Sequence, residues 1–174
     1  MIFIQSHTMN IRLLILLILF SLGGFVACKE DKTAEAEITE PVEAKPVPVA
    51  SQKFTADTVA SIIHWAGSKP TGRHTGTLKL KQGEIFAKNG IVETGKFTIN
   101  MNSITVTDPK GGKHKQDLEN HLKGVGKDGN EDHFFNTKKF PEGTFEITAI
   151  TAGDLTSTVE GNLTLKGITK NVKF

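Results

Sequence analysis

An all-β, antiparallel fold is predicted for the C-terminal two thirds of the chain from the alternation and spacing of its apolar residues. The clearest strand, residues 91–101, places Phe97, Ile99 and Met101 on one face, with polar residues between them. Just before it, Asn89-Gly90 is a strong hairpin signal, because both residues tolerate a positive φ. Alternation with period two between such turns is typical of antiparallel strands with one solvated face.

Two strands are predicted before this one. They are marked by pairs of apolar residues that share a face: Ile63 and Trp65, then Leu78 and Leu80. Gln82-Gly83 is predicted to turn the chain after the second pair. Gly95, inside the long strand, predicts a bulge or bend of the kind that a curved sheet needs.

A break and one helix follow the long strand. Residues 108–112 contain proline and glycine and are predicted to end the strand. Residues 114–123 then carry Leu118 and Leu122 at i and i+4 among polar residues, which predicts a short amphipathic helix. Residues 124–132 form a glycine-rich loop.

The remaining strands have the same alternation. Their markers are Phe145 and Ile147, then Leu163 and Leu165 after the Gly153-Asp154 turn, and finally Val172 and Phe174. A strand at the end of the sequence leaves an edge of unpaired backbone groups. The sheet is therefore expected to be incompletely closed at its C-terminal end, and the sequence is expected to be a fragment that lacks its last strands.

The N-terminus has the pattern of an export signal. After Arg12, residues 13–26 form an apolar stretch of roughly 14 residues, closer to a signal peptide than to a spanning helix of about 20. The stretch runs into Cys28, and the chain then becomes charged. This pattern resembles the signal peptide and lipobox of a bacterial lipoprotein. It implies that residues 1–27 are removed and that Cys28 is lipidated, anchoring the protein to an envelope membrane on its periplasmic or cell-surface side. An uncleaved N-terminal anchor is the alternative.

Composition limits the remaining possibilities. Residues 28–53 are rich in Glu, Ala, Pro and Val without an apolar period, which predicts a disordered tether after the lipidated cysteine. Residues 54–174 are one domain, long enough for a hydrophobic core. The net charge of +2 gives no reason to expect a nucleic-acid partner.

Cys28 is the only cysteine, so a disulfide framework and a thiolate zinc site are excluded. Nothing indicates an oligomeric state.

Several motifs in the domain resemble those of the YceI-like family. They are Ser61-Ile62-Ile63-His64-Trp65, Gly72-Arg73-His74-Thr75-Gly76-Thr77, Asn102-Ser103-Ile104 with Leu118-Glu119-Asn120-His121-Leu122, Phe134-Phe135 with Phe140-Pro141, and the segment from Gly161 to Lys170. The resemblance covers nearly all of residues 54–174. It implies a lipocalin-like antiparallel β-barrel with a short helix, a lumen that holds an isoprenoid-type lipid, and no established catalysis. In two respects the chain departs from the family: residues 125–133 are longer than the usual connection, and the family's strands continue beyond Phe174.

The apolar face of such a sheet is expected to line the lumen, because the outside of a small barrel is solvated. The predicted lumen residues are Ile63, Trp65, Leu78, Leu80, Phe97, Ile99, Met101, Phe145, Ile147, Leu163 and Leu165. The alternative is that they fill a solid core. The predicted mouth residues are Leu118, His121, Leu122, Phe134, Phe135 and Phe140. The three phenylalanines could equally plug one end of the barrel.

No catalytic, metal or cofactor site is predicted. His114 and His121 are too far apart on the predicted helix to chelate one ion together, and the domain has no nucleophile or phosphate-loop motif. The leading hypothesis is an envelope lipoprotein that binds and carries or sequesters an isoprenoid-type lipid. The alternative is a structural or interaction lipoprotein with a solidly packed β-domain and no small ligand.

Overall fold

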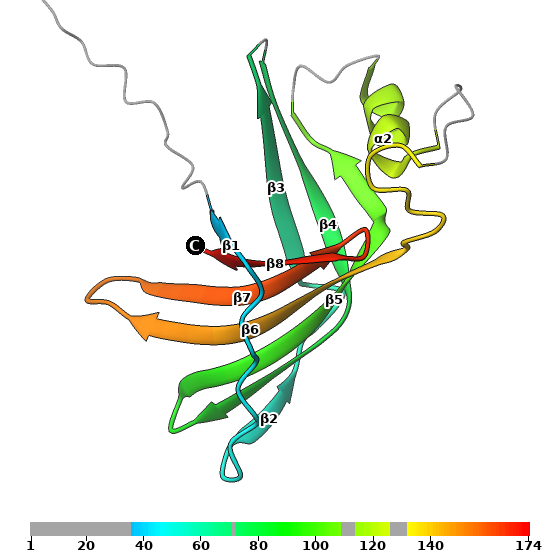
Figure 1. Cartoon of the computed structure of the whole chain (residues 1–174). Coiled ribbons are helices and arrows are strands. Elements are labelled where there is room, and N and C mark those ends of the chain that lie inside the picture. The colour runs from blue at the N-terminus through cyan, green and yellow to red at the C-terminus, as the bar shows by residue number, and fades with distance from the viewer. Residues whose placement is uncertain (1–35, 71, 109–113, 126–131) are drawn as a thin grey trace, which may run out of the picture. The chain divides into compact units, whose positions relative to one another are not determined.

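The computed structural model describes residues 36–70, 72–108, 114–125 and 132–174. The predicted signal peptide and Cys28 lie outside these residues. The strands are β1 Glu37–Thr39, β2 Gln52–Thr55, β3 Ile62–Lys69, β4 Gly72–Lys88, β5 Ile91–Val106, β6 Glu142–Ala152, β7 Ser157–Leu165 and β8 Ile168–Lys173. The helix α2 spans Lys115–Lys123 (Figure 1).

The eight strands form one antiparallel sheet in the order β1-β8-β7-β6-β5-β4. Both β2 and β3 pair with β4: β3 lies along its first half, and β2 lies along residues 84–87. Among the described residues, β1 at one edge does not pair with β2 or β3 at the other, so the sheet is not closed. The predicted fold, an all-antiparallel, incompletely closed barrel with one short helix, is confirmed.

Turns and bulges match the sequence only in part. Asn89 and Gly90 have φ values of 52° and 79°, which confirms the predicted hairpin turn. The turn predicted at Gln82-Gly83 is wrong, because β4 continues through it to Lys88 with a register shift between Leu80 and Gln82. No register shift occurs at Gly95 itself; the nearest one lies between Phe86 and Ala87.

The helix α2 forms where it was predicted and covers one end of the sheet. Leu122 is buried in a cluster with Leu78, Ile99, Met101 and Ile104. The Glu119 carboxylate accepts a hydrogen bond of 2.9 Å from the backbone N–H of Val106, which fixes the helix against the end of β5. The residues predicted to break the sheet (109–112) and most of the glycine-rich loop (126–131) lie outside the described residues.

The sequence predicts a disordered tether for residues 28–53, and the structure differs from this over its described part. We call residues 36–51 the strap. The strap begins with β1, which pairs with β8 and covers the edge that the sequence predicts to be open. It then runs past β7 and β6 to β2 (Figure 1). The strap has no periodic pattern of apolar residues. It is ordered by its pairing with β8 and by hydrogen bonds to side chains of β5 and β7. Within the described part of the chain, no helix has the length and hydrophobicity to cross a bilayer.

Candidate functional site

The predicted lumen residues lie on one face of the sheet. Cross-strand pairing places Leu80 opposite Ile99, Phe97 opposite Phe145, and Phe145 opposite Leu163. We call this side the apolar face. The neighbouring residues Thr94, Thr98 and Thr148 point to the opposite side, which is polar.

The sheet curves toward the apolar face. Trp65 on β3 and Leu163 on β7 both pack against the buried cluster that contains Ile99 and Met101. In a sheet that curls into an incompletely closed barrel, the face that carries the buried apolar cluster is the inner, concave one.

Three aromatic rings on the apolar face lie over glycines of neighbouring strands. A Cβ atom placed on each glycine would collide with the ring: 2.4 Å for Gly76 and Trp65 Cε2, 2.6 Å for Gly83 and Phe97 Cδ1, and 2.3 Å for Gly161 and Phe145 Cζ. The rings can lie flat against the sheet only because these positions have no side chain. Flat rings leave more of the middle of the barrel open than upright rings would. The sequence did not predict this role: only Gly83 carried a prediction, that of a turn, and the space that each glycine leaves depends on a ring from the neighbouring strand.

Burial varies along the apolar face. Leu78, Ile99, Met101 and Ile147 are buried. The other seven predicted lumen residues are half-buried: Ile63, Trp65, Leu80, Phe97, Phe145, Leu163 and Leu165. The face therefore combines a packed floor with large apolar side chains that keep part of their surface exposed.

The end of the barrel under α2 is filled. Leu118, Leu122 and Phe135 pack against or within the buried cluster, and the N–H of Phe135 donates to the carbonyl of Leu122 at 3.2 Å. Phe135 therefore packs as the alternative for the phenylalanines expects, against the buried cluster, and Leu118 and Leu122 of the predicted mouth pack with it.

Other predicted mouth residues form an aromatic cluster outside the plug. The His121 ring lies 4.4 Å from that of His133 and 5.3 Å from that of Phe134, which in turn lies 4.9 Å from Phe135. Phe140 is not part of this group. It lies beside the β7–β8 turn, where a Cβ on Gly167 would be 3.3 Å from its ring.

The loop that carries these rings is fixed by an ion pair. Lys166 Nζ lies 3.1 Å from Asp132 Oδ1 and also donates to the Asp132 carbonyl at 2.9 Å. The hydrogen bond from Lys166, together with one from the Asn136 amide, lowers the pKa of the Asp132 carboxyl from its ordinary value. Within the described ranges, no group of three or more His, Cys, Asp or Glu could hold a metal ion.

One polar atom in the apolar cluster has no partner. Trp65 Nε1 is buried without a hydrogen-bond acceptor among the described residues. An unsatisfied buried donor costs about 1–3 kcal/mol, so this indole is a weak point in the packing around β3.

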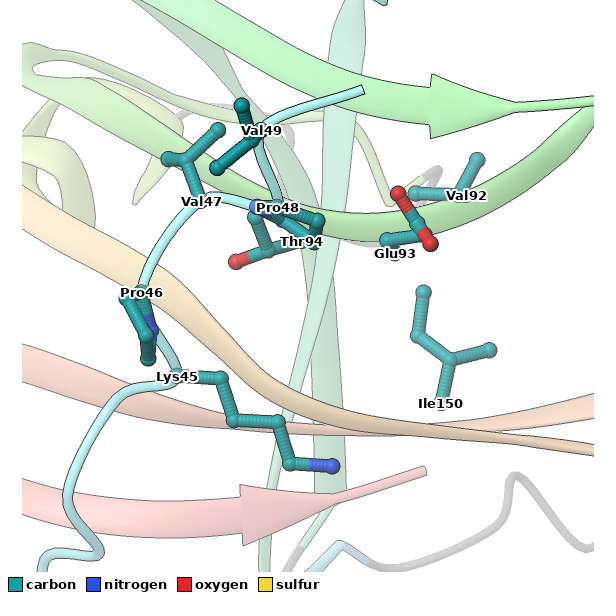
Figure 2. Close-up of a pocket in the computed structure, with 9 residues that line it drawn as sticks. All are labelled: Lys45, Pro46, Val47, Pro48, Val49, Val92, Glu93, Thr94 and Ile150. Atoms are coloured by element: carbon teal, nitrogen blue, oxygen red, sulfur yellow. The ribbon is translucent and has the colours of Figure 1, made fainter. Parts of the chain in front are cut away.

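A pocket lies between the strap and the sheet. Its volume is about 720 Å³, and Figure 2 shows its lining. The lining residues are Lys45, Pro46, Val47, Pro48, Val49, Val92, Glu93, Thr94 and Ile150. None of them is a predicted lumen or mouth residue. No signal in the sequence predicts this pocket, because the pocket depends on where the strap crosses the sheet.

The fold and the site define an open, lipocalin-like β-barrel with an apolar inner face and one plugged end. The family model described as YceI-like domain matches residues 54–174, so the chain belongs to this family. The match begins at Phe54, which leaves the strap outside the family domain.

Curated relatives match part of the chain. A UPF0312 protein of Pseudomonas aeruginosa (strain LESB58) is 33% identical over 85 residues, which are 49% of this chain and 37% of the relative. A protein YceI of Salmonella arizonae is 32% identical over 85 residues, with the same coverage of 49% and 37%. The matched region thus spans little more than a third of the length of these relatives.

Proposed function

We propose that residues 54–174 bind the hydrocarbon chain of an isoprenoid-type lipid against the apolar face. We further propose that lipidated Cys28 anchors the protein to an envelope membrane, where it carries or sequesters this lipid. The observation that supports the proposal best is the row of half-buried apolar side chains on the curved face, with three rings laid flat over glycines. The proposal includes no catalytic step and no metal or other cofactor.

The energetics favour a long apolar chain over a compact ligand. Each methylene transferred from water to an apolar surface contributes about 0.8 kcal/mol. A chain of roughly twenty carbons therefore offers a gross gain of about 16 kcal/mol, which exceeds the roughly 4–15 kcal/mol that association costs. The half-buried residues Leu80, Phe97, Phe145 and Leu163 would lose their remaining exposure when such a chain is bound.

Native mass spectrometry of the full chain, purified from membranes with mild detergent, tests the proposal. We expect a co-purifying apolar ligand, or stoichiometric uptake of an added polyisoprenoid. Phe97→Asp should abolish uptake, because it places a charge on the half-buried apolar face. Asn100→Asp is the matched control: it adds the same charge three residues along β5 on the opposite face, and its Oδ1 can still accept from the N–H of Asn102.

The outcomes separate the two hypotheses for the domain. Uptake by the wild type and by Asn100→Asp, but not by Phe97→Asp, supports the lipid-binding proposal. No ligand and no uptake in the wild type would instead favour a structural or interaction lipoprotein. The anchor is tested separately by Cys28→Ser, which should release the protein from the membrane fraction without changing uptake.

A further inference from the structure

The sheet has a split between its two central strands. β5 and β6 are paired only from Lys96–Glu146 to Asn100–Glu142. Beyond this ladder both strands continue, β5 back to Ile91 and β6 on to Ala152, with no β5–β6 register pair over these residues. One side-chain bond bridges the start of the split, from Thr94 Oγ1 to the Ile147 carbonyl at 3.2 Å.

The pocket of about 720 Å³ lies at this split. It is lined by Val92, Glu93 and Thr94 of β5 and by Ile150 of β6, with the strap residues 45–49 across it (Figure 2). The lining therefore comes from both strands of the split and from the segment that crosses them.

The pocket is lined from both faces of the sheet. Val159 lies on the same face of β7 as Gly161 and Leu163, because alternate residues of a strand share a face. Ile150 is the cross-strand partner of Val159, so Ile150 belongs to the apolar face. Thr94 precedes Gly95, which packs on the apolar face against Ile147 Cδ1, so Thr94 points to the outer face. The lining thus includes residues from both faces of the sheet, and the pocket lies where β5 and β6 are no longer paired.

The strap is fixed on both sides of the split by polar contacts. On the β7 side, the Asn162 side chain accepts from the Val42 N–H at 3.0 Å and donates to the Val42 carbonyl at 2.6 Å. On the β5 side, Ser51 Oγ donates to the Glu93 carboxylate. The buried cluster includes no strap residue, so residues 42–51 can lift off the split while β1 stays paired with β8. This breaks only a few exposed or half-exposed hydrogen bonds, each about 0.5–1.5 kcal/mol.

We propose that the split between β5 and β6 is a lateral portal for a hydrocarbon chain and that the strap is its gate. This inference rests on the proposed lipid-binding function. With one end of the barrel plugged by α2, a tail that enters between β5 and β6 reaches the apolar face without displacing the buried cluster. Val47, Val92 and Ile150 supply an apolar lining along this route.

The portal is suited to take its lipid from a bilayer. Large apolar side chains of the strap are exposed to solvent, at 66% for Ile38, 49% for Val42 and Val47, and fully for Val49. The strap is also the described segment nearest in sequence to Cys28, the proposed anchor. Apolar side chains on a membrane-tethered segment bind favourably at the bilayer interface, which would draw the strap away from the split.

A reversible crosslink between strap and sheet tests the gate. The full-length double variant Ser51→Cys/Glu93→Cys is joined by a short, reducible bis-methanethiosulfonate linker, and peptide mapping verifies the position of the link. Uptake of a fluorescent polyisoprenoid from phosphatidylethanolamine/phosphatidylglycerol vesicles is followed by stopped flow. We expect the linked protein to take up lipid at least about tenfold more slowly than the same protein after reduction, because a closed gate limits the rate of entry. The amount bound at equilibrium should be unchanged.

A loosened strap provides the opposite test. Asn162→Ala removes both hydrogen bonds to Val42 and should accelerate uptake, with the unlinked pair Ser51→Ala/Glu93→Gln behaving similarly. Equal rates before and after reduction, with normal final uptake, would overturn the portal and leave the lipid-binding function intact. No uptake by the wild type at any time would overturn both.

Discussion

Gly161→Ala tests the claim that aromatic rings lie flat over glycines on the apolar face. The new Cβ would be 2.3 Å from Phe145 Cζ and 2.8 Å from the Glu146 carbonyl oxygen. The ring can move only away from the sheet, and the backbone carbonyl cannot move without disturbing the β6–β7 ladder.

The expected effect is a net loss of stability. Overpacking of this kind costs about 1–3 kcal/mol, whereas alanine in place of glycine gains about 0.4–1 kcal/mol from the lower entropy of the unfolded chain. We therefore expect Gly161→Ala to lower the free energy of unfolding by about 1–2 kcal/mol. Gly67→Ala is the matched control, since a Cβ there meets nothing within 4 Å, and it should be neutral or slightly stabilising.

Urea denaturation followed by the fluorescence of Trp65, the only tryptophan, measures both variants. A double-mutant cycle with Phe145→Ala isolates the contact, because removing the ring should remove the part of the cost of Gly161→Ala that comes from Phe145 and leave only the part from the Glu146 carbonyl. If Gly161→Ala is as stable as Gly67→Ala, or if its cost adds fully to that of Phe145→Ala, the ring does not lie over this glycine and the reasoning is refuted.

Two further predictions concern the loops. Gly124 has a φ of 74°, and a Cβ there would be 2.4 Å from the His133 carbonyl oxygen. Gly124→Ala should therefore destabilise the protein by more than Gly90→Ala, because Gly90 has a similar φ of 79° but a Cβ there meets nothing within 4 Å. Each variant should lose about 1–2 kcal/mol of unfolding free energy from φ strain. Equal losses in urea denaturation would contradict the contact with His133. Backbone hydrogen bonds from Ala60 and Val59 lower the pKa of Asp57 below its ordinary value of 3.8. The ionised carboxylate thus stabilises the turn fully above the unfolded-state pKa, and this contribution is lost as pH falls through the folded pKa. In a carboxyl NMR titration Asp57 should titrate below 3.8; an unshifted midpoint, or amide exchange at Ala60 unaffected by Asp57→Ala, which removes the acceptor, would argue against this.

Local patterns were sufficient to predict much of the fold. The alternation of Phe97, Ile99 and Met101 predicted the face that carries the buried cluster, and Asn89-Gly90 predicted a hairpin whose backbone has the required positive φ values. Leu118 and Leu122 at i and i+4 predicted α2. Each signal is contained within a few residues, so no tertiary information was needed.

The features that the sequence did not predict depend on distant residues. Gly83 was taken as a turn because glycine favours turns, but its role is to leave room for the Phe97 ring from the neighbouring strand. The strap has the composition of a tether and becomes ordered through Asn162, 120 residues away from Val42. The split between β5 and β6 depends on where their pairing stops, and residue type alone does not specify this.

The most direct measurement of the central claim is the position of a bound chain relative to the two sides of the sheet. Intermolecular NOEs from a deuterated, methyl-labelled sample to an added polyisoprenoid would report it. Contacts to the methyls of Leu80, Leu163 and Leu165, and none to those of the exposed, outward-facing Ile62 and Ile91, are the predicted result. Saturating lipid with no contact to these leucines, or with contacts only to Ile62 and Ile91, would contradict the account.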